Sequence, residues 1–428
     1  MIFKNVRKGR NQSLLARLLV LAVLTSLSLL SFAADNYQVT DLGKLGGVTA
    51  EGSAINDSNV IVGFSSGDDF AAHAFAFSDG QMNDLGFLLS DAVPEGNSLG
   101  FGLNNNNIAV GYSVETKLNV DGDSVDVRVS TYFDIDNLTI NPVPQFDPDR
   151  PRESRGIAIN DNNIMVGFAS IDPPNDVDAN GDPQDFVFDR GYFYDINADQ
   201  MTIVGILEDN DSARVTLRAI HNDGFAVGIS GQLQAGQVIN SQVFSVNLSD
   251  PTTLSKIDIF GGVVQQVSGM NSAKKIVGSA RTADNRNVVG YVYDVQTSTS
   301  TALGTLNDNF KFSEAFDIND LDQIVGTSQI QSSPSAFHAI LYENDTLKDL
   351  SKIIGCDTGW ILQDARGISN AGIITGTGIF EGERRAYMLT PIAGIAPDCD
   401  ALNRSGGGST PLSGLIGLLL LGLYRQKS

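Results

Sequence analysis

Short apolar runs alternate with polar turns through most of the chain, and one arrangement of the two recurs. In each copy an apolar strand ends in Ile-Asn or a close variant, a polar turn follows, and a second apolar strand ends in Val-Gly or a variant. The Gly of the second strand stands at Gly63, Gly111, Gly167, Gly228, Gly278, Gly326 and Gly376, so successive copies lie 48 to 61 residues apart. A period of this length is typical of repeat architectures.

Each copy continues with two further strands. In the first copy a third strand with two aromatic residues, at 73–77, is followed by a fourth strand at residues 82–86. Runs of this length, bounded by Asn, Asp and Gly, predict strands joined by tight hairpins. We see no long helical period between residues 35 and 392. The pattern therefore predicts an all-β chain of four-stranded units.

Seven such units predict a β-propeller, because a single four-stranded sheet cannot bury both of its faces. The seventh unit stops after its third strand, at residues 386–389, whereas residues 37–43 have the sequence of a fourth strand and no unit of their own. We therefore expect the N-terminal strand to close a seven-bladed propeller over residues 35–392. An open β solenoid is the alternative, and it would leave unpaired strand edges at both ends.

The two ends of the chain have different patterns. Residues 1–34 combine five basic residues, an apolar run at 18–30 and small residues near Ala33, which is typical of a cleaved signal peptide. An uncleaved membrane anchor is the alternative. At the other end a linker at 393–410 contains a Gly-rich motif, and residues 411–428 form an apolar tail that ends in basic residues. Such a tail is expected to sort or anchor the protein in a membrane, with its basic end inside.

Charge and cysteine content agree with export. The chain has 28 basic and 50 acidic residues, and removal of seven basic residues at the two ends leaves a net charge of −29 for residues 35–405. Such a surface repels nucleic acid and anionic lipid, so we expect no nucleic-acid partner. In an oxidising compartment the two cysteines, Cys356 and Cys399, predict a disulfide.

Two segments carry family resemblances. The first unit reads Asp-Leu-Gly-Lys-Leu-Gly-Gly at 41–47, Ala-Ile-Asn-Asp at 54–57, Val-Gly-Phe-Ser at 62–65 and His-Ala-Phe at 73–75. It resembles the HAF repeat of bacterial extracellular and envelope proteins, a family classed as a domain of unknown function, and the sixth unit repeats the pattern at 338–340. The resemblance implies export and repeats but no activity. The C-terminal order of Gly-rich motif, apolar segment and basic end resembles the GlyGly-CTERM sorting tail. That resemblance implies cleavage of the tail by a rhomboid-type protease. Signal peptidase is the processing partner that the N-terminal pattern predicts.

Two motifs are candidates for catalysis. Residues 63–67 match the G-x-S-x-G elbow of serine hydrolases, but the strand-to-helix context is missing and Ser65 has counterparts in other units. We therefore interpret Ser65 as part of the repeat. His73 and His338 occupy equivalent positions, and we expect neighbouring backbone groups to satisfy their imidazoles. We predict no catalytic residue.

An acidic loop is the candidate metal site. Asp176, Asp178, Asn180 and Asp182 follow the D-x-D-x-N-G pattern of calcium loops, and Asp185 supplies a further carboxylate. The twelfth position of an EF-hand loop would be Val187 instead of Glu, and no flanking helices are evident. Calcium is therefore the cofactor that the sequence suggests, and a solvated acidic loop is the alternative.

The sequence is compatible with three functions. The first is a non-enzymatic protein of the cell surface or envelope that binds an unidentified surface protein or glycan through propeller loops. The alternatives are an envelope enzyme that acts on polysaccharide and a purely structural envelope component. An enzyme would bring carboxylates from different repeats together in one funnel, and the sequence alone does not show whether they meet.

Overall fold

The computed structural model describes residues 36–88, 96–118, 124–146, 152–171, 188–207, 214–234, 237–332 and 335–394. The expected signal peptide, the apolar tail and nearly all of the Gly-rich linker lie outside the described residues. In the segments that are described, no helix is both long enough and apolar enough to span a membrane.

The described chain consists of short strands and one turn of 3-10 helix. The first fourteen strands are β1 (Tyr37–Asp41), β2 (Gly46–Ile55), β3 (Ile61–Gly67), β4 (Ala72–Ser78), β5 (Gln81–Asp84), β6 (Ser98–Leu103), β7 (Ile108–Leu118), β8 (Ser124–Asp134), β9 (Thr139–Pro142), β10 (Ser154–Ile159), β11 (Ile164–Ile171), β12 (Phe188–Asp195), β13 (Gln200–Ile203) and β14 (Arg214–Ile220). The remaining elements are β15 (Phe225–Gln234), β16 (Gln237–Asn247), β17 (Asp250–Ile257), β18 (Gln265–Met270), β19 (Lys275–Arg281), β20 (Val288–Asp294), β21 (Thr299–Gly304), β22 (Ser313–Ile318), β23 (Ile324–Ser332), β24 (Ser335–Glu343), β25 (Thr346–Asp349), η1 (Leu350–Lys352), β26 (Trp360–Ile368), β27 (Ile374–Phe380) and β28 (Glu383–Pro391). The prediction of an all-β chain is confirmed.

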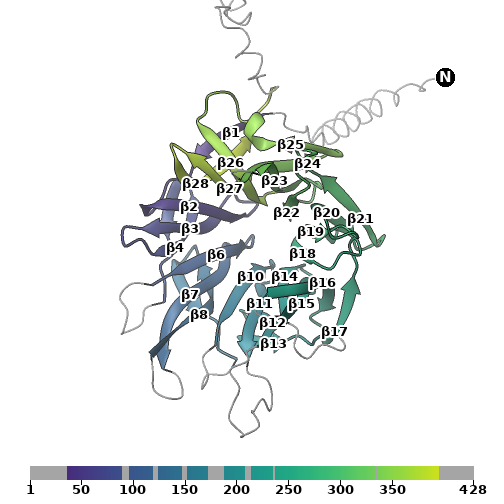
Figure 1. The fold of residues 1–428 in the computed structure, drawn as a ribbon. Helices are drawn as coiled ribbons and strands as arrows, with labels where there is room; N and C mark the ends of the chain where they lie inside the picture. The colour runs from purple at the N-terminus through teal and green to yellow at the C-terminus, as the bar shows by residue number, and fades with distance from the viewer. Residues whose placement is uncertain are drawn as a thin grey trace, which may run out of the picture.

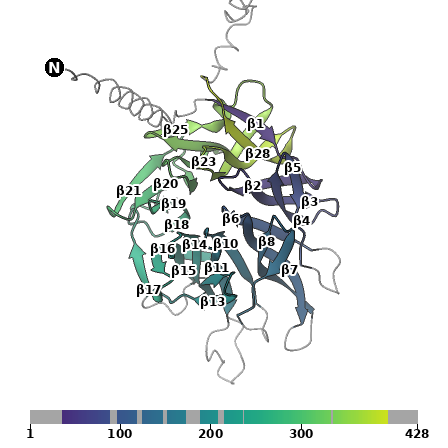
Figure 2. The same cartoon turned by 180° about the vertical axis from the view of Figure 1, so that it is seen from behind.

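Most strands belong to four-stranded antiparallel sheets in which each strand pairs with the next along the chain. Five such sheets run from β6–β9 to β22–β25 within the described residues. The other strands form one larger sheet with the order β26-β27-β28-β2-β3-β4-β5, and β1 pairs antiparallel with β28. One parallel residue pair, Thr49 with Arg384, joins β28 to β2. The sheets follow one another around a common centre, so that the purple first strands lie beside the yellow-green last ones (Figures 1 and 2).

The recurring glycine has a steric cause. A Cβ atom on Gly63 would collide with the backbone carbonyl of Glu51 on the strand before it, and the six equivalent glycines face the same obstacle. In every unit the first strand also has a register shift beside this glycine, for example between Leu217 and Ala219. Such a β-bulge inserts an extra residue and re-aims its side chain. The bulge residues are Ser53, Phe101, Ile157, Arg218, Ser268, Phe316 and Arg366.

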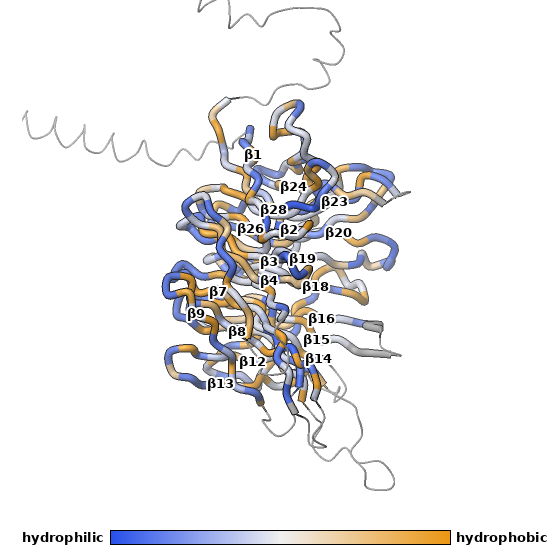
Figure 3. The backbone as a smooth tube through the Cα atoms, turned by 90° about the vertical axis from the view of Figure 1, so that its left-hand side faces the viewer, coloured by the Kyte–Doolittle hydropathy of each residue, from blue (hydrophilic) through white to orange (hydrophobic). Residues whose placement is uncertain are grey.

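Apolar side chains fill the space between neighbouring sheets. One core cluster joins Val166 and Phe193 of β11 and β12 to Leu217 and Phe244 of β14 and β16. Hydrophobic residues follow the strands, and many of the turns at both sides are hydrophilic (Figure 3). Because burial of apolar surface is the main stabilising term, these face-to-face contacts hold consecutive sheets together.

Candidate functional site

The turns after the first strands of the units are joined by hydrogen bonds. We call their seven turn residues the inner belt: Asp57, Asn105, Asp161, Asn222, Ser272, Asp320 and Asn370. The backbone N–H of Asn105, for example, donates to Oδ1 of Asp161 at 2.9 Å, and that of Asp161 donates to Oδ1 of Asn222 at the same distance. The Asn-Asp pairs of the repeat therefore do more than form turns, because they also connect neighbouring sheets.

A second set of bonds lies one residue earlier in each unit. The side-chain amide of Asn56 donates to the carbonyl of Asn104 at 3.1 Å, and Asn104 repeats the contact with Asn160. His221 occupies the place of Asn in the fourth unit, and its Nε2 lies 3.1 Å from the carbonyl of Ser272. The belt fixes one end of a cavity whose walls are the first strands.

This cavity has a volume of about 870 Å³ and is lined by residues of β2, β6, β10, β14, β18, β22 and β26 and the turns that follow them. All seven bulge residues contribute to its wall. Three of the lining residues are arginines from different sheets: Arg155, Arg218 and Arg366. Five acidic residues also line the cavity, so its wall carries charges of both signs.

Two of these arginines are held by nearby carboxylates and rings. Nε of Arg366 lies 3.2 Å from Oδ1 of Asp364, and its guanidinium lies 4.1 Å from the centre of the Phe316 ring. Nε of Arg155 donates to Glu153 at 2.6 Å. Arg218 differs, because its buried Nε has no hydrogen-bond partner and no carboxylate of the described residues forms an ion pair with it.

Two acids of different units, Glu51 and Glu314, have raised pKa values, and of these two Glu51 is a lining residue of the cavity. Glu51 lines it and forms an ion pair with Arg384 at 2.9 Å. Burial raises the pKa of Glu51, an effect that Arg384 partly offsets. Burial also raises the pKa of Glu314 on β22, and Arg366 opposes that shift. Carboxyl groups with raised pKa values near a cleft are candidates for proton transfer.

Asp317 is a further acid in the cavity wall. Its carboxylate accepts the backbone N–H of Ile318 and that of Ile368 on the neighbouring strand, both at 2.9 Å. The surrounding strands enclose it, and this burial raises its pKa to about 6, although the two backbone N–H groups oppose the shift. Asp317 therefore links β22 to β26 at the cavity.

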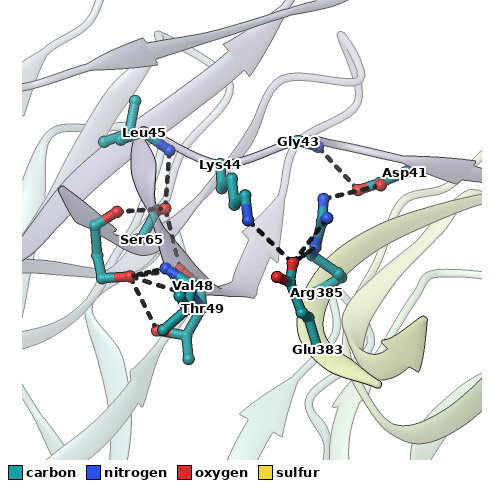
Figure 4. A network of polar contacts seen from close by, with 10 residues as sticks. Asp41, Gly43, Lys44, Leu45, Val48, Thr49, Ser65, Glu383 and Arg385 are labelled. Carbon is teal, nitrogen blue, oxygen red and sulfur yellow. Dashed lines mark hydrogen bonds and ion pairs between the residues drawn. The ribbon is translucent and has the colours of Figure 1, made fainter. Parts of the chain in front are cut away.

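The structure gives Ser65 a structural role. Its buried hydroxyl accepts the backbone N–H of Leu45 at 3.0 Å and donates to the carbonyl of Thr49 (Figure 4). Ser113 and Ser328 accept from Leu88 and Leu306 in the same way, at 2.9 and 3.1 Å. The serine of the G-x-S sequence thus holds the loop that leads into each of these three units.

The histidines have partners other than those expected. Nδ1 of His73 lies 2.8 Å from Asp84, and Nδ1 of His338 lies 2.9 Å from Asp349. The partners are carboxylates on the fourth strand instead of backbone groups. Neither histidine lines the cavity.

The expected calcium loop, with Asp176, Asp178, Asn180, Asp182 and Asp185, lies outside the described residues, and so does Cys399. The disulfide to Cys356 therefore stays a prediction. Over the residues that the structure does describe, no three His, Cys, Asp or Glu side chains are grouped so that they could hold a metal ion. The described residues offer no support for calcium.

The sequence interpretation missed the residues of the cavity. Arg155, Arg218, Arg366 and Glu51 stand at positions of the first strand where the seven units differ from one another. The units vary at the positions three and five residues before the Asn, or before His221 and Ser369, which replace it in two units. This variation was the available signal.

Neither a protein-family model nor a curated protein sequence matches the chain. An oligogalacturonate lyase in complex with manganese is 15% identical with a TM-score of 0.52, over 85% of this chain and 97% of that one. Oligogalacturonate lyase from Vibrio parahaemolyticus is 12% identical with a TM-score of 0.51, over 82% and 93% of the two chains. The β-propeller domain of the trilobed protease from Pyrococcus furiosus is 8% identical with a TM-score of 0.45, over 86% and 98%.

At these identities the likeness is one of fold. The described residues of this chain do not offer a site for a metal such as the manganese of the first structure. The prediction of a non-enzymatic binding protein is nevertheless corrected, because the two solved structures that share the fold best among those named are enzymes. The physical reason is that acidic residues of different repeats line one cavity, which the sequence could not show. The chain thus has an all-β, propeller-like fold of four-stranded antiparallel sheets, similar to that of the oligogalacturonate lyases.

Proposed function

We propose that this protein is an exported β-propeller enzyme of the bacterial envelope that acts on a polysaccharide at its central cavity. The observation that carries the proposal is the position of Glu51. Its carboxyl group lines the cavity, and burial raises its pKa. A carboxyl group that keeps its proton closer to neutral pH can act as a general acid, and after deprotonation as a base.

The proposed architecture has seven blades, and β1 completes the last one. Two observations support this count. The larger sheet divides into two four-stranded units where a single residue pair joins β28 to β2. Arg385 on β28 also lies 3.1 Å from Asp41 on β1 (Figure 4). This pair stands at the positions that His73 and Asp84 occupy in the first unit.

The enzyme reading has further support from the surroundings of Glu51. Arg384 holds the Glu51 carboxylate in place, while Arg366 and Asp364 also act on its charge. These groups come from β26 and β28, so their positions relative to Glu51 depend on the contact between β28 and β2. The likeness to oligogalacturonate lyases favours carbohydrate as the substrate class.

The test is an activity screen of the purified protein on neutral and acidic polysaccharides. Mass spectrometry of the products distinguishes hydrolysis, which adds water across the bond, from elimination, which leaves an unsaturated sugar. Glu51→Gln should lower kcat roughly 10²–10⁴-fold. Glu115→Gln, on β7 and not part of the cavity wall, is the matched control and should leave the rate unchanged. A Glu51→Gln variant with the full rate of the native protein would rule out this role.

Export and processing are part of the same proposal. The HAF-like repeats, the N-terminal apolar segment and the GlyGly-CTERM-like tail support secretion and cleavage by signal peptidase and a rhomboid-type protease. The intact mass of the exported protein should lack residues 1–34 and the apolar tail. Peptide mapping without reduction should join Cys356 to Cys399.

A further inference from the structure

Arg218 is a charged group without a counter-charge in the described structure. It is the bulge residue of β14, and its side chain lines the cavity. Its Nε is buried and lacks a hydrogen-bond partner. By contrast Arg155, Arg366 and Arg384 each lie within 3.2 Å of a carboxylate.

An arrangement of this kind is unfavourable in the free protein. Arg218 is half-buried, and its buried Nε loses hydration without a hydrogen bond in return. Arg155 adds repulsion, because burial and then Arg155 both lower the pKa of Arg218. The bulge that aims Arg218 into the cavity is nevertheless part of every unit, and the equivalent positions hold Ser, Phe and Ile in five of them. Packing of the repeat therefore does not require a guanidinium at this place.

We infer that Arg218, supported by Arg155, binds a carboxylate of the substrate, so that the polysaccharide is an acidic one built with uronate units. The inference rests on the proposed function, since it names the substrate class of the same cavity. A guanidinium presents a planar fork of donors that matches a carboxylate in a bidentate contact. A bound carboxylate would supply both the missing acceptor of Nε and the missing counter-charge.

The cavity is also polar along its length. Arg218 lies on β14, whereas Asn222 of the inner belt lies in the turn that follows this strand. The belt carries the exposed carboxylates of Asp57, Asp161 and Asp320. Glu51 and Asp317 also line the wall, but Glu51 is paired with Arg384. An anionic sugar unit is therefore favoured beside the unpaired Arg218 and repelled at the belt. This difference orients the ligand with its carboxylate toward Arg218.

The experiment is a calorimetric titration of the full protein with trigalacturonate and with its methyl ester, which is the same sugar without charge. The native protein should bind the acid, and the ester should bind roughly 10–100-fold more weakly, because charge-assisted hydrogen bonds are lost. Arg218→Gln should weaken binding of the acid by the same factor and leave binding of the ester unchanged. Arg286→Gln removes an exposed arginine from a surface loop and is the matched control, with no change expected.

The melting temperature separates this role from a structural one. Without ligand, Arg218→Gln should melt no lower than the native protein, because it removes an unpaired charge. If the glutamine variant does not fold, Arg218→Lys keeps the charge without the planar fork and should still lose several-fold in affinity for the acid. Equal binding of acid and ester, or inorganic phosphate that competes as well as trigalacturonate, would overturn the inference. If the protein binds trigalacturonate but turns over no polysaccharide, the inference about Arg218 stands and the proposed enzymatic function is rejected. If it turns over a neutral polysaccharide and Arg218→Gln has no effect, the enzymatic function stands and the inference about Arg218 is rejected.

Discussion

Asn370 and Asp57 are 313 residues apart in the chain and are joined by two hydrogen bonds. The backbone N–H of Asn370 donates to Oδ1 of Asp57 at 2.9 Å, and its side-chain amide donates to Oδ2 at 3.0 Å. The same backbone contact links Asp320 to Asn370 at 2.9 Å, between units that are consecutive in sequence. The first and last units thus meet through the contact that joins their neighbours.

Asp57→Ala should lower the free energy of unfolding by roughly 1–2 kcal/mol, because the N–H of Asn370 loses its acceptor. Asp57→Asn is the control, since Asn already holds this place at Asn105, Asn222 and Asn370 and keeps an Oδ1 acceptor. The free energy of unfolding of Asp57→Asn should lie within about 0.5 kcal/mol of the native value. Urea unfolding of the three proteins measures both values. Equal stability of the native protein and Asp57→Ala would show that the contact between Asp57 and Asn370 does not stabilise the fold.

Tyr37→Ala tests the contribution of β1. Tyr37 is 1% exposed and packs in one core cluster with Val325, Leu341 and Tyr387. Loss of a buried ring of this size should cost roughly 3–5 kcal/mol, a large share of a typical unfolding free energy. Thermal unfolding with two probes, one near Trp360 and one for total β content, should show a single transition at lower temperature. Unchanged melting would mean that β1 contributes nothing to the stability of the other sheets.

Ser65→Ala separates the structural role of this serine from a nucleophilic one. The variant leaves the backbone N–H of Leu45 without its acceptor, which should cost roughly 1–3 kcal/mol. Ser113→Ala removes the equivalent contact to Leu88 and should cost about as much. Catalytic turnover should persist in both. A loss of turnover in Ser65→Ala alone, with native stability, would instead identify Ser65 as a nucleophile.

The strands could be predicted from sequence because their signals are local. The apolar run at 73–77 became β4 (Ala72–Ser78), and the segment at 37–43 contains β1. Asn and Asp residues between the apolar runs predicted the hairpin turns, and the recurring Gly indicated the length of the repeat. These features depend on neighbours within a few residues.

The cavity could not be predicted in the same way. A strand normally alternates its faces with a period of two, so side chains can be assigned to a face by counting. The bulge at Arg218 and Arg366 breaks that count, and the sequence does not mark it. The partner of His73 could have been predicted from the sequence. Asp84 follows His73 by eleven residues, and Asp349 follows His338 by the same number.

Asp317 should make the stability of the protein depend on pH. Its pKa in the folded protein is about 6, above the ordinary value of 3.8 that it regains on unfolding. Between about pH 4 and pH 6 the folded state therefore holds a proton that the unfolded state has lost, so the free energy of unfolding falls as pH rises through this window. Above pH 6 the full penalty of a buried carboxylate is present.

Asp317→Asn removes this titration and keeps an oxygen that can accept one of the two backbone N–H groups. Relative to the variant, the native protein should gain roughly 1–3 kcal/mol when the pH falls from about 7 to about 4. Asp320→Asn is the control, because the Asp320 side chain lies exposed in the inner belt and its substitution should leave the pH dependence of the native protein in place. Urea unfolding of the three proteins at both pH values provides the comparison. If native protein and Asp317→Asn respond to pH in parallel, the Asp317 carboxylate is hydrated through the cavity, and its two backbone contacts then stabilise the charged form at no cost from burial.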